Sequence, residues 1–119
     1  MEIHERACDT PGVTLLDLDG GLDHTNTNLF VGKMDALLEQ GAARVVLDLE
    51  HLTYVSSWGL AALVRVHHRF SVRGGRIGFA RLHSSVATVL QVTQLDRLFD
   101  LYPTLPEALR HVAPSGLEA

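Results

Sequence analysis

The sequence predicts a single α/β domain with a mostly parallel, mixed β-sheet, an amino-terminal β-hairpin and about four α-helices. Its 119 residues are the length of one ordinary domain and leave no room for two independent cores. With 46% hydrophobic and 20% charged residues, the composition is that of a globular chain that buries a core. Strand-like and helix-like segments alternate after the hairpin, and strand-helix-strand crossovers build parallel sheets. We expect the domain to span residues 1–113 and a flexible tail to occupy 114–119.

The hairpin is predicted from a turn signal between two strand-like runs. Asp9-Thr10-Pro11-Gly12 combines a proline, which presets the bend, with a glycine, which tolerates positive φ. Residues 2–7 and 13–18 on either side read as paired strands. Gly20-Gly21 is expected to end the second strand, since glycine pairs interrupt regular structure.

The first helix is predicted from its capping residues and its apolar stripe. Polar residues from Thr25 to Asn28 can satisfy free backbone amides at its start, and Gly41 stops it. Four apolar residues share one helical face, namely Phe30, Met34, Leu37 and Leu38. The β-branched run from Arg44 to Leu49 then predicts a strand buried on both faces of a parallel sheet.

The second half of the chain repeats this order of strand and helix. A helix that closes at Gly74-Gly75 carries an apolar stripe of Leu60, Leu63, Val64, His67 and Phe70, while Trp58, Arg65 and Arg69 point roughly the other way. The remaining expected elements are a strand at 76–80, a helix capped by Ser84-Ser85, a strand at 98–101 and a last helix from 104 to 112. Thr104 and Glu107 form a capping-box pattern at the start of that helix.

Charge and residue usage exclude several classes of function. The net charge of -4 has the wrong sign for a chain that grips phosphate backbones, so we expect no direct contact with nucleic acid. The seven histidines show no metal-ligand spacing, so we expect neither a metal nor a cofactor. No segment approaches the ~20 apolar residues of a membrane helix, and the amino terminus lacks a signal peptide's apolar stretch. We therefore expect a cytoplasmic protein without membrane insertion.

Catalytic motifs are also missing from the sequence. Residues 55–59, VSSWG, do not form a GxSxG nucleophile elbow, and Gly32-Lys33 lacks the spacing of a phosphate-binding loop. The lone Cys8 can form no internal disulfide and has no nucleophile context. The sequence does not exclude a catalytic triad of serine, histidine and an acid from separate segments, although no motif points to particular residues. We expect a binding protein rather than an enzyme.

One long run carries a more specific signal. The strand VVLDL at 45–49 is followed by LTYVSSWGLAAL at 52–63, and GLDH at 21–24 precedes the first helix. These segments resemble the signature of STAS domains, as in bacterial anti-sigma factor antagonists. The segments GGRI at 74–77 and VATVLQVTQLDRLF at 86–99 are similar to the family's later strand and helix. The resemblance covers almost the entire chain in the order of elements derived above, and it implies a STAS-like fold.

The resemblance also implies a regulatory site. The family's site is usually written aspartate, serine, serine or threonine, glycine, and its first serine accepts phosphate from an anti-sigma kinase. That serine is Ser57 here, whereas Ser56 stands at the usual aspartate position and Trp58 at that of the second small hydroxyl residue. By this resemblance the chain binds an anti-sigma factor, a serine kinase, and frees a sigma factor until Ser57 is phosphorylated.

Five residues around Ser57 are expected to contact the partner, namely Asp23, His24, Ser56, Trp58 and Gly59. The loops of Asp23 and Ser57 both leave the carboxyl ends of strands, so they should lie at one end of the sheet. A phosphate on Ser57 would be stabilised by the helix dipole and would repel acids such as Asp23 at an interface. Trp58 could be an exposed contact hot spot or fold back onto the Asp23 loop.

Other interpretations stay open at this point. Ser56 or Ser57 could serve only as a helix cap. The replacements at positions 56 and 58 would also suit a STAS scaffold that is never phosphorylated and works in a larger signalling or transport complex. A STAS domain that binds a nucleotide or small ligand is a further alternative, and a homodimer is possible.

Overall fold

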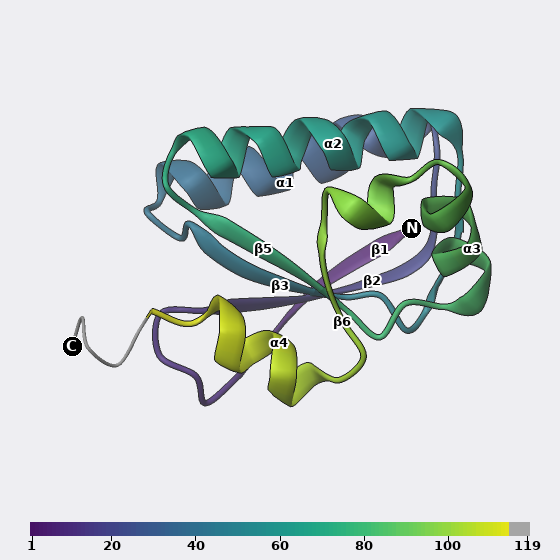
Figure 1. Cartoon of the computed structure of the whole chain (residues 1–119). Helices are drawn as coiled ribbons and strands as arrows, with labels where there is room; N and C mark the ends of the chain where they lie inside the picture. The colour runs from purple at the N-terminus through teal and green to yellow at the C-terminus, as the bar shows by residue number, and fades with distance from the viewer. Residues whose placement is uncertain (115–119) are drawn as a thin grey trace.

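Residues 1–114, the part of the chain that the computed structural model describes, form a β-sheet with helices on both faces (Figure 1). The elements in chain order are β1 (Glu2–Arg6), β2 (Thr14–Leu22), α1 (Thr27–Glu39), β3 (Arg44–Asp48), β4 (Leu52–Val55), α2 (Ser57–Val72), β5 (Arg76–Ala80), α3 (Ser84–Val92), the short 3-10 helix η1 (Leu95–Arg97), β6 (Asp100–Tyr102) and α4 (Leu105–Val112). Apart from Pro114, the expected tail at 114–119 lies outside the described residues.

The sheet confirms the predicted fold class. Its strand order is β1-β2-β3-β5-β6, and β4 pairs with the far end of β2. β1 runs antiparallel to β2, and all the other pairs are parallel. The parallel order arises because each crossover between β2, β3, β5 and β6 carries at least one helix. Within the described residues, no helix is long and apolar enough to cross a membrane.

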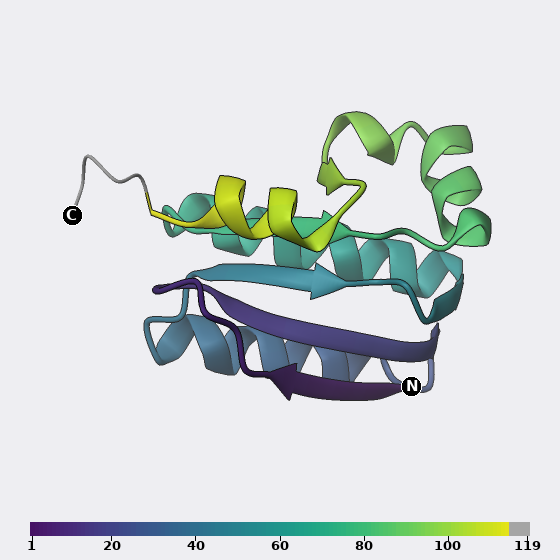
Figure 2. The same cartoon turned by 90° about the horizontal axis from the view of Figure 1, so that it is seen from below.

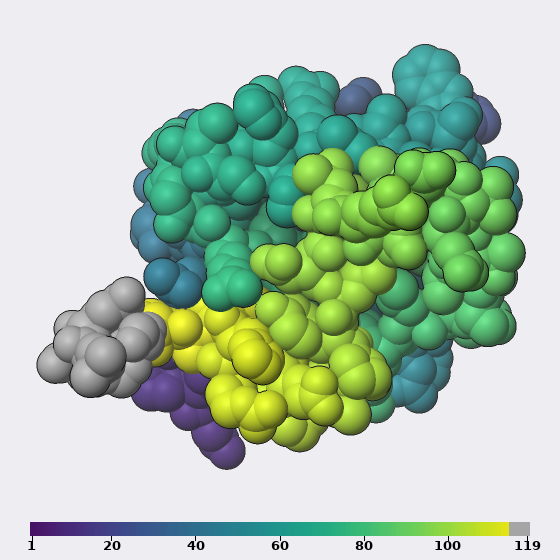
Figure 3. All heavy atoms as spheres, viewed as in Figure 1, coloured from purple at the N-terminus to yellow at the C-terminus, as the bar shows by residue number. Residues whose placement is uncertain are grey.

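Two helical layers enclose the sheet. α1 and α2 lie side by side on one face, and α4 lies on the other (Figures 1 and 2). The segment from α3 to β6 fills the space between α2 and α4 on the side seen in Figure 3. A smaller core lies beneath α4, formed by Leu15, Val46, Ala80, Ala108 and Val112.

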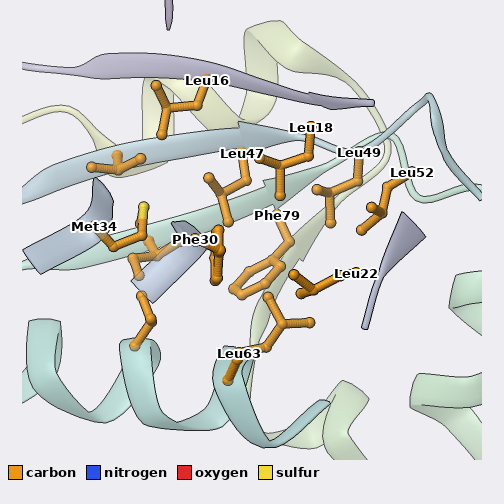
Figure 4. Packing of buried hydrophobic residues seen from close by; sticks show 14 of the residues in the cluster. Leu16, Leu18, Leu22, Phe30, Met34, Leu47, Leu49, Leu52, Leu63 and Phe79 are labelled. Atoms are coloured by element: carbon orange, nitrogen blue, oxygen red, sulfur yellow. The ribbon is translucent and has the colours of Figure 1, made fainter. Parts of the chain in front are cut away.

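The main core lies between the sheet and the helices α1 and α2. Figure 4 shows side chains of the sheet facing those of the helices, among them Leu16, Leu18, Leu47, Phe79, Phe30, Met34 and Leu63. All four members of the stripe predicted for α1 are buried, which confirms the period of that helix. The stripe predicted for α2 is confirmed in part, since Leu63 and Phe70 are buried and Leu60 and Val64 are half-buried against the core. The centre of the buried face is rotated toward Gly59, Ala62 and Val66. The rotation follows from the close approach of Gly59 to the sheet, described below.

Three other boundaries differ from the prediction. β2 does not end at Gly20-Gly21 but continues to Leu22, because Gly20 takes φ 110° at a bulge and the strand gains β4 as a new partner. β4 itself was not predicted, since only its two end residues are buried and its sequence does not alternate. The expected strand at 98–101 is β6 at 100–102, preceded by η1.

The helix caps agree with the sequence in part. The Thr104 hydroxyl accepts a hydrogen bond from the backbone N–H of Glu107 at 3.3 Å, as the capping pattern predicts. The cap expected from Ser84-Ser85 is supplied by His83 instead, whose Nδ1 lies 3.3 Å from the backbone nitrogen of Ser85. Ser85 uses its hydroxyl to donate to the carbonyl of Thr53 at 2.7 Å, which ties α3 to β4.

Candidate functional site

The pairing of β2 with β4 brings the Asp23 and Ser57 segments together. Leu22 is in register with Val55, and the backbone N–H of Ser56 donates to the Leu22 carbonyl at 2.9 Å. Asp23 follows β2 directly, and Ser56 follows β4 directly. Both therefore lie at the same edge of the sheet, where the chain enters α1 and α2.

Gly59 allows this close approach. A Cβ atom at this position would lie 2.5 Å from the Leu22 carbonyl oxygen and 2.9 Å from Cγ1 of Val55. The start of α2 therefore packs directly on the ends of β2 and β4, and any side chain would push it away. Gly59 is buried, and the structure gives it a packing role; the partner contact expected for it from the sequence stays a prediction.

The two serines have different roles in this structure. Ser56 is the N-cap of α2, and its Oγ accepts a hydrogen bond from the backbone N–H of Gly59 at 3.2 Å. Ser57 is the first residue of the helix and is exposed. Within residues 1–114 its hydroxyl makes no hydrogen bond, so it is available to another molecule. Helix capping thus accounts for Ser56 and leaves Ser57 without a structural task.

Replacing the cap should separate the two roles. Ser56→Ala is expected to lower the free energy of unfolding by about 1 kcal/mol, because the backbone N–H of Gly59 at the start of α2 loses its hydrogen-bond acceptor. Ser57→Ala should leave it within about 0.5 kcal/mol, as is usual for exposed substitutions. Urea denaturation followed by circular dichroism measures both. A larger loss for Ser57→Ala than for Ser56→Ala would show that the roles are reversed.

Asp23 is held in place by its own loop. Its Oδ1 accepts hydrogen bonds from the Thr25 hydroxyl at 2.5 Å and from the Thr25 backbone N–H at 2.9 Å. Both hydrogen bonds keep the pKa of Asp23 below its ordinary value, and the bond from the hydroxyl has the larger effect. Asn26 fixes the same loop, since its side chain accepts from the Asp23 backbone and donates to the Gly21 carbonyl at 2.7 Å. The site therefore presents a fixed negative charge at neutral pH.

Trp58 lies on the outer side of α2 and is 66% exposed. It borders a surface depression of about 240 Å³ between α1 and α2, which we call the Trp58 groove; its other lining residues are Thr27, Asn28, Val31, Ala61, Ala62 and Arg65. This exposure does not fit the alternative in which Trp58 folds back onto the Asp23 loop. His24 is exposed at the same end of the molecule.

The residues of α1 that line the Trp58 groove were not predicted from the sequence. Thr27, Asn28 and Val31 come into contact with this region only through the packing of α1 on α2, for which no local pattern gives a signal. Arg65 could have been identified, because it follows Trp58 by seven residues and points in the same direction. No group of three or more His, Cys, Asp or Glu side chains in the described part of the chain could hold a metal ion.

Comparisons with known proteins identify the family and support the fold. The family model described as the STAS domain matches residues 6–108. A Thermotoga neapolitana protein, provisionally named an anti-sigma factor antagonist, is 30% identical over 101 residues, which cover 84% of this chain and 89% of that protein. The anti-sigma F factor antagonist of Paenibacillus polymyxa is 25% identical over 99 residues, covering 82% and 85% of the two chains. The crystal structure of a provisionally assigned anti-sigma factor antagonist from Thermotoga maritima superposes with a TM-score of 0.83 at 27% identity, covering 92% of this chain and 93% of that one.

Proposed function

Because the chain belongs to the STAS domain family, we propose that it is an anti-sigma factor antagonist, which binds an anti-sigma factor with serine kinase activity and so releases a sigma factor. The observation that carries the proposal is the free, exposed hydroxyl of Ser57 at the start of α2, beside the fixed carboxylate of Asp23. The names of the relatives at 30% and 25% identity support the same activity.

Phosphorylation of Ser57 acts as the off-switch in this proposal. The backbone N–H groups at the start of α2 and the positive end of its dipole stabilise a phosphate, so the domain stays folded when it is modified. At an interface the phosphate adds about -1.5 to -2 charge units that must be desolvated. The charge of Asp23 adds to this negative field, and a partner whose contact surface fits the unmodified hydroxyl is repelled.

The partner surface consists of Asp23, His24, Ser56 and Trp58 around Ser57. The serine at position 56, where the family usually has aspartate, keeps the helix start intact because serine and aspartate are about equally good N-caps. Trp58 replaces a small hydroxyl residue with a large exposed ring, a residue type that often dominates binding energy. The protein acts by binding alone, without catalysis or a cofactor, in the cytoplasm where sigma factors work.

A STAS scaffold that is never phosphorylated is the second candidate, and the exposed Trp58 beside Ser57 is the observation that favours it. Such a scaffold would use the same surface constitutively. A nucleotide site at the start of α2 receives less support, since the Trp58 groove there, of about 240 Å³, is smaller than the ~300 to 1,000 Å³ of typical small-molecule pockets.

Binding of a phosphate mimic tests the proposal. The wild type, Ser57→Glu and Ser57→Ala are titrated with each anti-sigma kinase encoded by the source organism. We expect one kinase to bind the wild type and Ser57→Ala alike, and to bind Ser57→Glu at least about tenfold more weakly because the added charge is desolvated at the contact. The thermal unfolding temperature of Ser57→Glu should not fall below that of the wild type, because an acidic side chain in the first helical turn is favourable.

Two results would count against the switch. Equal affinity for Ser57→Glu and the wild type would favour the constitutive scaffold. Failure of every anti-sigma kinase to bind the unmodified protein would remove the proposed function altogether.

A further inference from the structure

The charges at the two ends of the Trp58 groove are opposite. Arg65 lines one end and forms no ion pair with any residue of the described range 1–114. Arg69, one turn further along α2, is paired with Asp35 of α1. The other end of the groove lies at the start of α1, next to the loop that holds the Asp23 carboxylate. An incoming partner thus meets an unmatched cation at one end and a fixed anion at the other.

The middle of the groove is apolar. Trp58, Val31, Ala61 and Ala62 form it, and most of the indole ring stays exposed to an incoming side chain. Trp58 and Arg65 are seven residues apart, which is two helical turns or about 10 Å along α2. A helix lying along the groove repeats this spacing, since its residues at i and i+7 also face one side.

We propose that the Trp58 groove receives a helix of the anti-sigma factor, which places an apolar side chain against Trp58 and a carboxylate two turns away on Arg65. This inference rests on the proposed function and adds the recognition chemistry of its partner. Charge decides which end of the groove receives the carboxylate, because Arg65 attracts it and Asp23 repels it. Ser57 precedes Trp58 in the chain, so a phosphate there faces the end of the groove that already bears the negative charge.

A label on the indole ring tests this directly, since Trp58 is the only tryptophan of the chain. The protein is prepared with 5-fluorotryptophan, and its fluorine NMR signal is followed while the anti-sigma kinase that binds in the titration above is added. We expect the signal to shift as the ring becomes covered. Arg65→Glu is expected to weaken binding at least about tenfold through charge reversal at the contact.

Arg110→Glu is the matched control, because Arg110 is an exposed arginine on α4, on the opposite face of the sheet, and the variant changes the net charge equally. It should bind like the wild type. Circular dichroism of both variants confirms that they are folded. Restored binding of Arg65→Glu by a partner variant with a lysine in place of one helical carboxylate would identify the paired residue and support the inference further.

The outcomes separate the inference from the proposed function. A kinase that binds tightly, leaves the fluorine signal unchanged and does not distinguish Arg65→Glu from the wild type would overturn the groove while the proposed function stands. A signal that shifts with protein concentration alone would show that a second copy of this chain occupies the groove, and would also overturn the inference. If no anti-sigma kinase binds the wild type, both proposals fail.

Discussion

Gly59→Ala is expected to lower the free energy of unfolding by about 3 kcal/mol, the upper part of the range for overpacked positions. The added methyl group would lie 2.5 Å from a backbone carbonyl oxygen, that of Leu22, which has no freedom to turn aside. α2 must therefore move outward, and its first residues move with it. Because Ser57 and Trp58 belong to those residues, partner binding should fall as well. Urea denaturation measures the stability, and titration with the partner measures the affinity.

Gly32→Ala is the matched control for this substitution. Gly32 lies in the interior of α1, and a Cβ atom there meets nothing within 4 Å. Alanine at an exposed helical position is favoured over glycine, so the free energy of unfolding should rise by about 0.5 to 1 kcal/mol. Equal and small effects of the two alanines would show that α2 does not pack on β2 as closely as described.

Asp48→Asn is expected to lower the free energy of unfolding by about 2 to 3 kcal/mol at neutral pH. Asp48 ends β3 and is only 3% exposed. Its carboxylate accepts hydrogen bonds from Arg81 at 2.5 and 3.1 Å and from Arg6 at 2.9 Å, so it joins β1, β3 and the segment after β5. Removing its charge takes the shared partner from two guanidinium groups. Arg6 keeps its pair with Asp17 and Arg81 its pair with Glu50, and both arginines are partly exposed, so the cost stays below that of breaking a fully buried pair.

The pH dependence of this effect follows from the pKa of Asp48. Burial alone would raise this pKa, but the hydrogen bonds from Arg81 and the Glu50 backbone, with the charges of Arg81 and Arg6, outweigh burial and lower it. The contribution of Asp48 is therefore fully present above the pKa of the unfolded carboxyl, about 3.9, and is lost as the pH falls through the lower folded value. Wild type and Asp48→Asn should differ in stability at pH 7 and converge in strong acid.

The control for this pair of measurements is Asp100→Asn. Asp100 is paired with Arg76 at 3.2 Å, but its carboxylate is 40% exposed, whereas that of Asp48 is buried, and pairs at the surface contribute at most about 1 kcal/mol. Two results would contradict the role assigned to the buried carboxylate. One is a loss of unfolding free energy in Asp48→Asn no larger than that in Asp100→Asn. The other is a stability difference between wild type and Asp48→Asn that stays constant from pH 7 down to strong acid.

Elements with a strong local period were predictable from the sequence. The stripe of Phe30 and Met34 identified α1, and the β-branched run ending at Asp48 identified β3. β4 was missed because four residues with buried ends carry no alternation, and its pairing with β2 depends on the bulge at Gly20. Such pairing is decided by tertiary contacts, which single-sequence patterns do not contain.

The features of the candidate site also divide into those that local sequence predicts and those that depend on tertiary contacts. The rule that loops leave parallel strands at their carboxyl ends was enough to expect Asp23 beside Ser57. The packing role of Gly59 was not predictable, since it depends on a contact with a strand more than thirty residues earlier. The α1 wall of the Trp58 groove depends in the same way on how two helices lie against each other. Local chemistry could be predicted, whereas the surfaces formed between elements could not.

Phosphate mapping on the wild-type protein tests the central claim most directly. The purified chain is incubated with ATP and a lysate of the source organism, its intact mass is measured, and any added phosphate is located by peptide fragmentation. The account predicts one phosphate, on Ser57. An unmodified Ser57, in an experiment where a control STAS protein is phosphorylated in its own cognate lysate, would contradict the switch and leave a constitutive scaffold that binds through Trp58.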